Sequence, residues 1–162
     1  MAKRDRWYVL RVRAGCEALV ISELRQRGIE VFLPSNSFHI SRESDDSHIL
    51  ARFSVTNQKK VSLVPGVLDL VGVPRPSPIP DRDVANLKAA TDAGMTMKIL
   101  PIAGAPVRGR ISKGPLSGHD GSFIEHRGLW SLVVPLETLQ CRLAFPLPPS
   151  SLPISRKYKN RT

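Results

Sequence analysis

The sequence predicts an α+β domain over its first 100 residues, followed by a small all-β barrel and a basic tail. Up to residue 100, hydrophobic spacing changes between the period of a strand and that of a helix, which is typical of α+β domains. After residue 106 the helical period is absent, and short apolar runs alternate with glycine-containing turns. The 14 prolines among 162 residues argue against a long helical bundle, and a hydrophobic share of 41% is enough to form a core.

The first 47 residues are predicted to contain a strand, a helix and a second strand. Residues 7–12 (WYVLRV) are apolar, aromatic and β-branched, as in a buried strand. The apolar residues that follow are spaced by three and four, like one face of a helix: Cys16, Leu19, Val20 and Leu24. Gly28 is a typical helix end, residues 29–33 are expected to form the second strand, and the polar residues 35–47 a loop.

Three strands and two helices complete the predicted α+β domain. Alternation of apolar and polar residues over 49–55 predicts a half-buried strand. A short helix or turn over 57–64 and a strand over 67–73 follow. Beyond a proline-rich stretch, the helix predicted over 81–94 begins with an aspartate that can cap it and ends at a glycine. Residues 97–100 are expected to form the last strand of this domain.

Residues 101–106 (PIAGAP) are expected to link this domain, residues 1–100, to a second one. The second domain, over 107–147, is predicted to be a barrel, because short strands in so few residues bury their apolar sides by closing on themselves. The predicted strands are residues 108–112, 122–125, 130–134 and 141–145. Residues 148–162, rich in Pro and Ser and then basic, are expected to be a disordered tail.

The net charge of +10, from 24 Lys and Arg against 14 Asp and Glu, is concentrated at the two ends of the chain. Residues 1–10 carry +2 and residues 155–162 carry +4, which leaves +4 for the remainder. Basic ends attract phosphate groups through counterion release, without reading a base sequence. They also keep a protein soluble, so the charge alone leaves both interpretations open.

No residue pattern in the sequence indicates catalysis. The four histidines have no Cys or His partner at a zinc spacing, and no nucleophile elbow or phosphate-binding loop is present. Cys16 and Cys141 are 125 positions apart and are expected to be small buried thiols. There is no run of about 18 apolar residues and no signal-peptide pattern. We therefore expect a cytoplasmic protein that is not an enzyme, holds no metal or cofactor and does not enter a membrane.

Two sets of motifs resemble the NusG family. Residues 7–10 (WYVL), followed by a helix and then by residues 31–34 (VFLP), resemble the opening of the NusG N-terminal domain. Residues 64–67 (VPGV) resemble the second half of that domain, and residues 107–121 (VRGRISKGPLSGHDG) resemble a KOW motif. The resemblance implies a ferredoxin-like N-terminal domain, with an antiparallel sheet and helices, and an SH3-like KOW barrel.

The resemblance also implies a function in transcription. The FLP at residues 32–34 is typical of the specialised NusG paralogues of the RfaH, LoaP and UpxY kind. These bacterial proteins bind elongating RNA polymerase and suppress pausing or termination on particular operons. The KOW domain of the family contacts a ribosomal small-subunit protein or the termination factor Rho, and we expect a monomer. The alternative is a KOW-type RNA-binding protein of the ribosome or its assembly, whose basic C-terminus would bind RNA phosphates.

By resemblance, several residues are expected to contact the transcription complex. Those that would face RNA polymerase are Arg11, His48 and Leu50 toward its clamp and Gln58 and Lys59 toward its gate loop. Arg13 would approach the non-template DNA strand. The alternative for the charged side chains among them is that they are solvated. In the KOW motif, turns or close approaches of the backbone are expected at glycines, and the motif residues are Gly114, Leu116, Gly118 and Gly121.

One segment departs from the family pattern. Relatives carry an aromatic, proline-containing segment just before the third strand, where it supplies an apolar contact to the clamp. Residues 44–49 (SDDSHI) stand in its place here. The carboxylates of Asp45 and Asp46 thus replace an apolar anchor, and His48 replaces a tyrosine.

Overall fold

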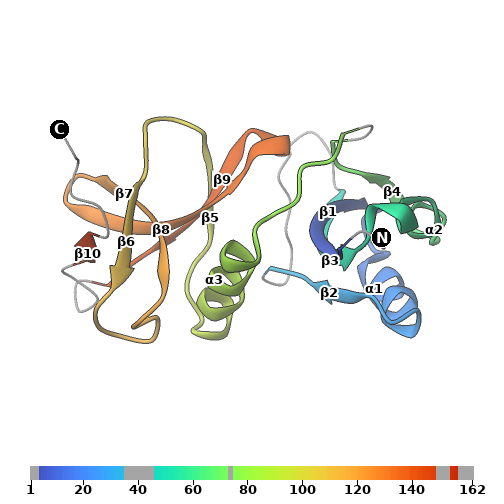
Figure 1. The fold of residues 1–162 in the computed structure, drawn as a ribbon, viewed down its shortest axis with the longest axis horizontal. Helices are drawn as coiled ribbons and strands as arrows, with labels where there is room; N and C mark the ends of the chain where they lie inside the picture. The colour runs from blue at the N-terminus through green and yellow to red at the C-terminus, as the bar shows by residue number, and fades with distance from the viewer. Residues whose placement is uncertain (1–3, 35–45, 73–74, 149–153, 157–162) are drawn as a thin grey trace. The chain divides into compact units, whose positions relative to one another are not determined.

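The computed structural model describes residues 4–34, 46–72, 75–148 and, for the backbone alone, 154–156. Its contacts divide the chain into two compact units, Met1–Asp81 and Arg82–Thr162. Each unit contains its own antiparallel sheet (Figure 1). The predicted fold class, an antiparallel sheet with helices followed by a second antiparallel sheet, is confirmed.

The N-terminal unit is built on a four-stranded antiparallel sheet in the order β2-β3-β1-β4. Its strands are β1 (Arg6–Val12), β2 (Glu30–Phe32), β3 (Ser47–Phe53) and β4 (Val67–Leu70). β1 pairs with β3 along its whole length, from Arg6 opposite Phe53 to Val12 opposite Ser47. β3 therefore begins two residues earlier than predicted, in the polar stretch that was expected to be a loop.

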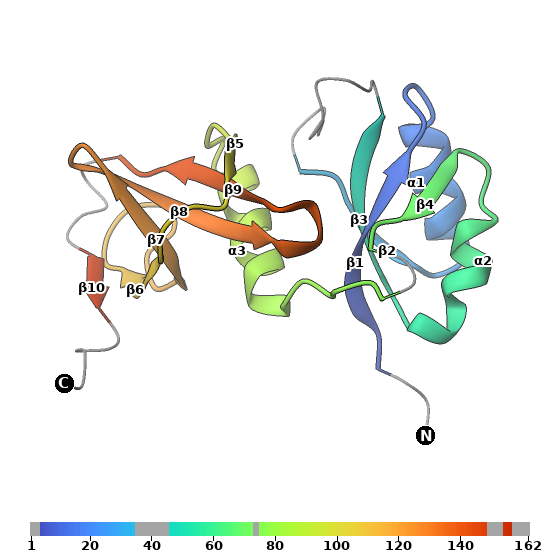
Figure 2. The ribbon, with the colours of Figure 1, turned by 90° about the horizontal axis from the view of Figure 1, so that it is seen from above.

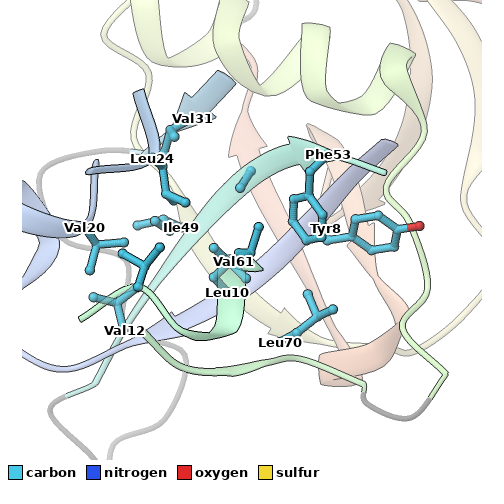
Figure 3. Packing of buried hydrophobic residues seen from close by; sticks show 12 residues of the cluster. Tyr8, Leu10, Val12, Val20, Leu24, Val31, Ile49, Phe53, Val61 and Leu70 are labelled. Atoms are coloured by element: carbon cyan, nitrogen blue, oxygen red, sulfur yellow. The ribbon is translucent and has the colours of Figure 1, made fainter. Parts of the chain in front are cut away.

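The helices of this unit cover one face of the sheet. They are α1 (Glu17–Gln26), a 3₁₀ turn η1 (Val55–Asn57) and α2 (Gln58–Ser62). Val20 of α1 and Val61 of α2 join one hydrophobic cluster with Leu10 of β1 and Ile49 of β3 (Figure 3). These side chains alternate with others that point to the opposite face, as the pleat of a strand requires.

The C-terminal unit contains a six-stranded antiparallel sheet in the order β10-β6-β7-β8-β9-β5. Its strands are β5 (Lys98–Pro101), β6 (Val107–Ile111), β7 (Asp120–His126), β8 (Leu129–Leu136), β9 (Cys141–Pro146) and β10 (Ile154–Arg156). The four strands predicted for the barrel correspond to β6, β7, β8 and β9. Their inward side chains, among them Phe123, Leu132 and Phe145, are fully buried.

Two strands differ from the prediction. β5 was expected in the first domain, but it pairs with β9, from Lys98 opposite Ala144 to Pro101 opposite Cys141. β10 lies in the tail that was expected to be disordered, and it pairs with β6. Both segments extend the sheet at its edges. There the backbone N–H and C=O groups of β6 and β9 would otherwise lack a strand partner, and even a short strand can form hydrogen bonds with them.

Helix α3 (Asp81–Asp92) forms where the sequence predicts it, and its contacts place it with the C-terminal unit (Figures 1 and 2). The side-chain amide of Asn86 donates a hydrogen bond to the backbone oxygen of Asp120 at 2.7 Å. The contact boundary falls after Asp81, the first residue of α3, about twenty residues ahead of the predicted linker over 101–106. The predicted domain boundaries stay a prediction.

Candidate functional site

The predicted contact residues of β1 and β3 lie on the sheet face opposite the hydrophobic cluster. Arg11 of β1 is directly opposite His48 of β3 on one side and Asp69 of β4 on the other. Residues directly opposite each other on neighbouring strands share a face, so these three side chains form a row across the sheet. Leu50, two positions from His48, points to the same face, whereas Ile49 between them points into the cluster. His48 and Leu50 are nevertheless buried, at 5% and 0% exposure, so of the three predicted clamp contacts only Arg11 lies at the surface.

Arg11 holds two carboxylates at the centre of this row. Its Nε and Nη2 atoms donate hydrogen bonds to Oδ1 and Oδ2 of Asp69 at 3.2 and 2.7 Å, and its Nη1 donates to Oδ2 of Asp46 at 3.2 Å. The hydrogen bond and charge of Asp69, helped by Asp46, raise the pKa of Arg11 above its ordinary value. The side chains of Arg11 and Asp69 remain 41% and 46% exposed, so this ion cluster is available to a partner.

Asp46 has a defined place in this arrangement. The sequence predicts that it replaces an apolar anchor, and the structure pairs its carboxylate with Arg11. Asp45 lies outside the described residues. Sequence reasoning missed Asp69, whose position depends on the register between β1 and β4. The sequence signal is limited to an aspartate between two leucines, which indicates that this side of the strand is polar.

The remaining contact residues of the N-terminal unit lie elsewhere. Gln58 and Lys59 begin α2, whose Val61 packs in the cluster on the other face of the sheet. Lys59 is exposed and Gln58 is half-buried. Arg13, also exposed, follows the end of β1, where its backbone N–H donates to the oxygen of Gly66 at 2.9 Å. The predicted polymerase contacts thus form two groups, one on each side of the sheet.

The KOW motif residues form the connection between β6 and β7 and the start of β7. Gly114 and Gly118 have φ values of +91° and +85°, which favour glycine. Between them, Leu116 is buried, and the N–H of Gly118 donates to the oxygen of Ile111 at 2.8 Å. At Gly121 the backbone instead lies close to a neighbouring side chain, because a Cβ there would be 2.7 Å from the side chain of Leu132.

Within the described parts of the chain, neither a metal-binding cluster nor a membrane-spanning helix is present. There, no group of three or more His, Cys, Asp or Glu residues is placed to hold a metal ion. No helix in those ranges is long and apolar enough to cross a membrane. A groove of about 280 Å³ at the start of β1 is lined by Arg4, Arg6, Pro78, Ile79, Pro80 and Asp81.

The two thiols are expected to differ in reactivity. Burial raises the pKa of Cys141 to about 11, and its side chain is 6% exposed, whereas Cys16 is half-buried. At pH 8 only about one Cys141 thiol in a thousand is ionised, and the thiolate is the nucleophile. Iodoacetamide at pH 8 should therefore label Cys16 well before Cys141, as measured by mass spectrometry. Equal labelling in the folded protein would contradict the burial of Cys141, and labelling in urea gives the control.

A family profile covers the N-terminal half of the chain. The family described as "Transcription termination factor nusG" matches residues 5–88, just over half of the sequence. The chain belongs to the NusG family. No match is found among curated proteins.

Two solved structures of NusG and Spt5 proteins are similar to this NusG-family chain over most of its length. The Thermotoga maritima NusG structure titled "Domain interaction in Thermotoga maritima NusG" is 15% identical, with a TM-score of 0.47 over 96% of this chain and 98% of that one. The MjSpt4:Spt5 complex is 16% identical, with a TM-score of 0.32 over 94% and 99%. Neither similarity carries the assignment, which rests on the family profile.

The NusG match covers the whole N-terminal sheet, α1 and α2, and so includes the ion cluster of Arg11, Asp46 and Asp69. It ends at residue 88, inside α3. Residues 82–88 of α3 therefore belong to the family domain by sequence and to the C-terminal unit by contact.

Proposed function

We propose that this NusG-family chain is a transcription elongation factor that binds RNA polymerase through its N-terminal unit. The observation that carries the proposal is the NusG match over residues 5–88, because it covers the sheet and both helices of that unit. The FLP at residues 32–34 supports the finer assignment to the specialised paralogues, which suppress pausing or termination on particular operons. Such a factor acts by binding in the bacterial cytoplasm, as a monomer and without catalysing a reaction.

The separation of the contact residues into two groups supports a bridging role. The ion cluster around Arg11 lies on one side of the sheet, and Lys59 on α2 lies on the other. We assign the first group to the polymerase clamp and the second to the gate loop. A factor that contacts both the clamp and the gate loop binds the elongating conformation of RNA polymerase more tightly than a paused one. Its binding therefore stabilises the elongating conformation.

The polar character of the Arg11 surface determines how the clamp contact would behave. Relatives supply an apolar anchor where this chain places Asp46, paired with Arg11. Contacts between exposed charges are screened by salt, whereas apolar contacts are not. We therefore propose a clamp contact that weakens as the salt concentration rises.

Two further contacts belong to the same proposal. The exposed Arg13, at the end of β1, would approach the non-template DNA strand. The KOW unit would bind a ribosomal small-subunit protein or Rho. These assignments rest on the positions of the family motifs in the sequence.

One observation favours the alternative, a KOW-type RNA-binding protein of the ribosome or its assembly. The C-terminal unit carries twelve Lys and Arg against five Asp and Glu, whereas the N-terminal unit carries twelve against nine. The C-terminal unit thus accounts for +7 of the net charge of +10, and phosphate groups are attracted to such a surface. A ribosome-pelleting assay run beside a polymerase pull-down separates the two functions.

Replacing Arg11 with alanine tests the proposed clamp surface. The substitution removes the cation of the cluster and leaves the carboxylates of Asp46 and Asp69 facing the partner. We expect RNA polymerase to bind about tenfold more weakly, the usual effect of removing one good interface contact. Binding is measured by titrating a labelled elongation complex with the purified chain.

The matched control is Arg25→Ala, at an exposed arginine on α1, on the other side of the sheet. It should leave polymerase binding unchanged, and circular dichroism should show that both variants are folded. Equal affinities for the wild type and the Arg11→Ala variant would contradict the assignment of this surface.

A further inference from the structure

The C-terminal end of α2 carries the most exposed large apolar side chain in the described parts of the chain. Leu63, the C-cap residue of this helix, is 80% exposed, whereas the nearby Val61 and Val64 are buried. The backbone N–H of Leu63 donates to the oxygen of Lys59 at 3.2 Å, so the helical turn continues through Leu63. Val61 packs in the hydrophobic cluster (Figure 3), and the side chain of Leu63 projects into solvent.

Leu63 shares a face of α2 with Lys59. Residues four apart on a helix are neighbours on its surface, so the side chain of Leu63 adjoins that of Lys59. Lys59 is exposed, as is Lys60, which follows it in the sequence. The surface at this end of α2 is therefore an apolar side chain bordered by ammonium groups. Because Lys59 is assigned above to the gate loop, Leu63 lies within reach of the same partner.

A second exposed leucine lies where the turn after α2 meets α1. A Cβ atom on Gly66 would lie 2.9 Å from Cβ of Cys16 and 2.8 Å from Cγ2 of Val20, so this turn packs against the start of α1 (Figure 2). Leu19, next to Val20, is 51% exposed, and Leu63 comes three residues before Gly66. Single exposed leucines are ordinary, but large apolar side chains that gather at one place indicate an interaction surface.

The side of the sheet that carries Arg11 differs in its chemistry. Leu50 is buried there, and the exposed groups include the ion pair of Arg11 and Asp69. Asp46, which stands where relatives supply an apolar anchor, is also paired with Arg11. Of the two surfaces assigned to RNA polymerase, the one on the helix side is therefore the one that offers exposed leucines.

We propose that Leu63, flanked by Leu19, is the apolar anchor of this chain on RNA polymerase, and that it binds an apolar side chain of the gate loop that is bordered by carboxylates. The inference rests on the function proposed above and deepens it, because it names the residue and the partner chemistry of the α2 contact. The carboxylates would complement Lys59 and Lys60. Burial of Leu63 would supply a part of the affinity that salt does not screen.

A protein fits this surface better than a single-stranded nucleic acid does. Proteins that bind single strands commonly stack the bases on aromatic side chains. Residues 55–66 contain no aromatic residue, and Trp7, Tyr8 and Phe53 of the sheet are buried. The lysines of α2 could attract phosphates, but that attraction would not depend on Leu63.

Two alanine variants one helical turn apart separate the apolar contact from the charged one. Leu63→Ala and Lys59→Ala are titrated against a labelled elongation complex at low and at high salt concentration. We expect Leu63→Ala to bind about tenfold more weakly than the wild type at both concentrations, because burial of apolar surface is not screened. The loss in Lys59→Ala should be smaller and should disappear at high salt.

The matched control is Leu129→Ala, at the first residue of β8, whose side chain is 65% exposed. It should bind the elongation complex like the wild type. Because Leu63 and Leu129 are both exposed, both variants are expected to fold, and their circular dichroism and thermal unfolding should match those of the wild type.

The outcomes distinguish this inference from the proposed function. If the wild type binds the elongation complex and Leu63→Ala binds it equally well, or loses affinity only at low salt, the anchor is wrong and the proposed function is untouched. A wild type that does not bind would overturn both. The inference would also be overturned if Leu63→Ala weakened binding to a free single-stranded DNA or RNA oligonucleotide as much as to the elongation complex, since the partner would then be a nucleic acid.

Discussion

Replacing Gly66 with alanine is expected to destabilise the N-terminal unit by about 3 kcal/mol. Gly66 has a φ of +97°, and a residue with a side chain loses about 1–2 kcal/mol of stability in this conformation. A Cβ there would also lie 2.8 Å from Cγ2 of Val20 and 2.9 Å from Cβ of Cys16, and overpacking of this kind costs about 1–3 kcal/mol. Urea unfolding followed by the fluorescence of Trp7, in a Trp130→Phe background, measures the loss.

Gly28→Ala separates the two causes. Gly28 also has a positive φ, of +76°, but no atom lies within 4 Å of the position that its Cβ would take. Only the backbone cost remains, so we expect a loss of about 1 kcal/mol. If both alanine variants lost the same free energy of unfolding, the close approach of the Gly66 loop to α1 would be wrong.

Arg142→Ala is expected to destabilise the C-terminal unit by about 2–3 kcal/mol. The substitution removes two short hydrogen bonds from a buried guanidinium to the backbone oxygens of Ala103 and Gly104. It should also release residues 101–106, which are exposed, to proteolysis. Urea unfolding followed by Trp130 fluorescence, in a Trp7→Phe background, gives the first effect, and limited proteolysis of the full chain gives the second.

Arg110→Ala is the control for the loss of an arginine from the same sheet. Arg110 bonds the carboxylate of Asp120 at 2.7 Å, but its side chain is 52% exposed. Exposed ion pairs contribute little to stability, so this variant should unfold like the wild type and keep residues 101–106 resistant. Equal behaviour of the two variants would mean that Arg142 does not fasten the segment.

Local patterns predict much of the fold, because the spacing of apolar residues reflects the period of a strand or helix. β1, α1, α3 and the strands β6–β9 form where this spacing predicts them. The beginning of β3 could not be predicted in this way, because its first residues, Ser47 and His48, are polar. Ser47 is nevertheless buried, and its hydroxyl donates a hydrogen bond to the carboxylate of Glu17.

Pairing between distant segments could not be predicted from local patterns. The apolar residues of β5 indicate a strand, but they do not specify whether its partner is β4 or β9. The same reason explains why one half of the ion pair in the candidate site was not predicted. Arg11 was predicted by family resemblance, whereas its partner Asp69 depends on the register of β1 with β4, which is irregular after Arg11. A short sequence pattern does not contain that register.

Binding to elongating RNA polymerase is the most direct test of the proposed function. The purified full chain is mixed with stalled elongation complexes and, separately, with ribosomes at the same salt concentration, and the bound fraction of each is measured. The account predicts that the wild type binds the elongation complex, that Arg11→Ala binds it about tenfold more weakly, and that rising salt releases both. A chain that pellets with ribosomes and does not bind the elongation complex would contradict it.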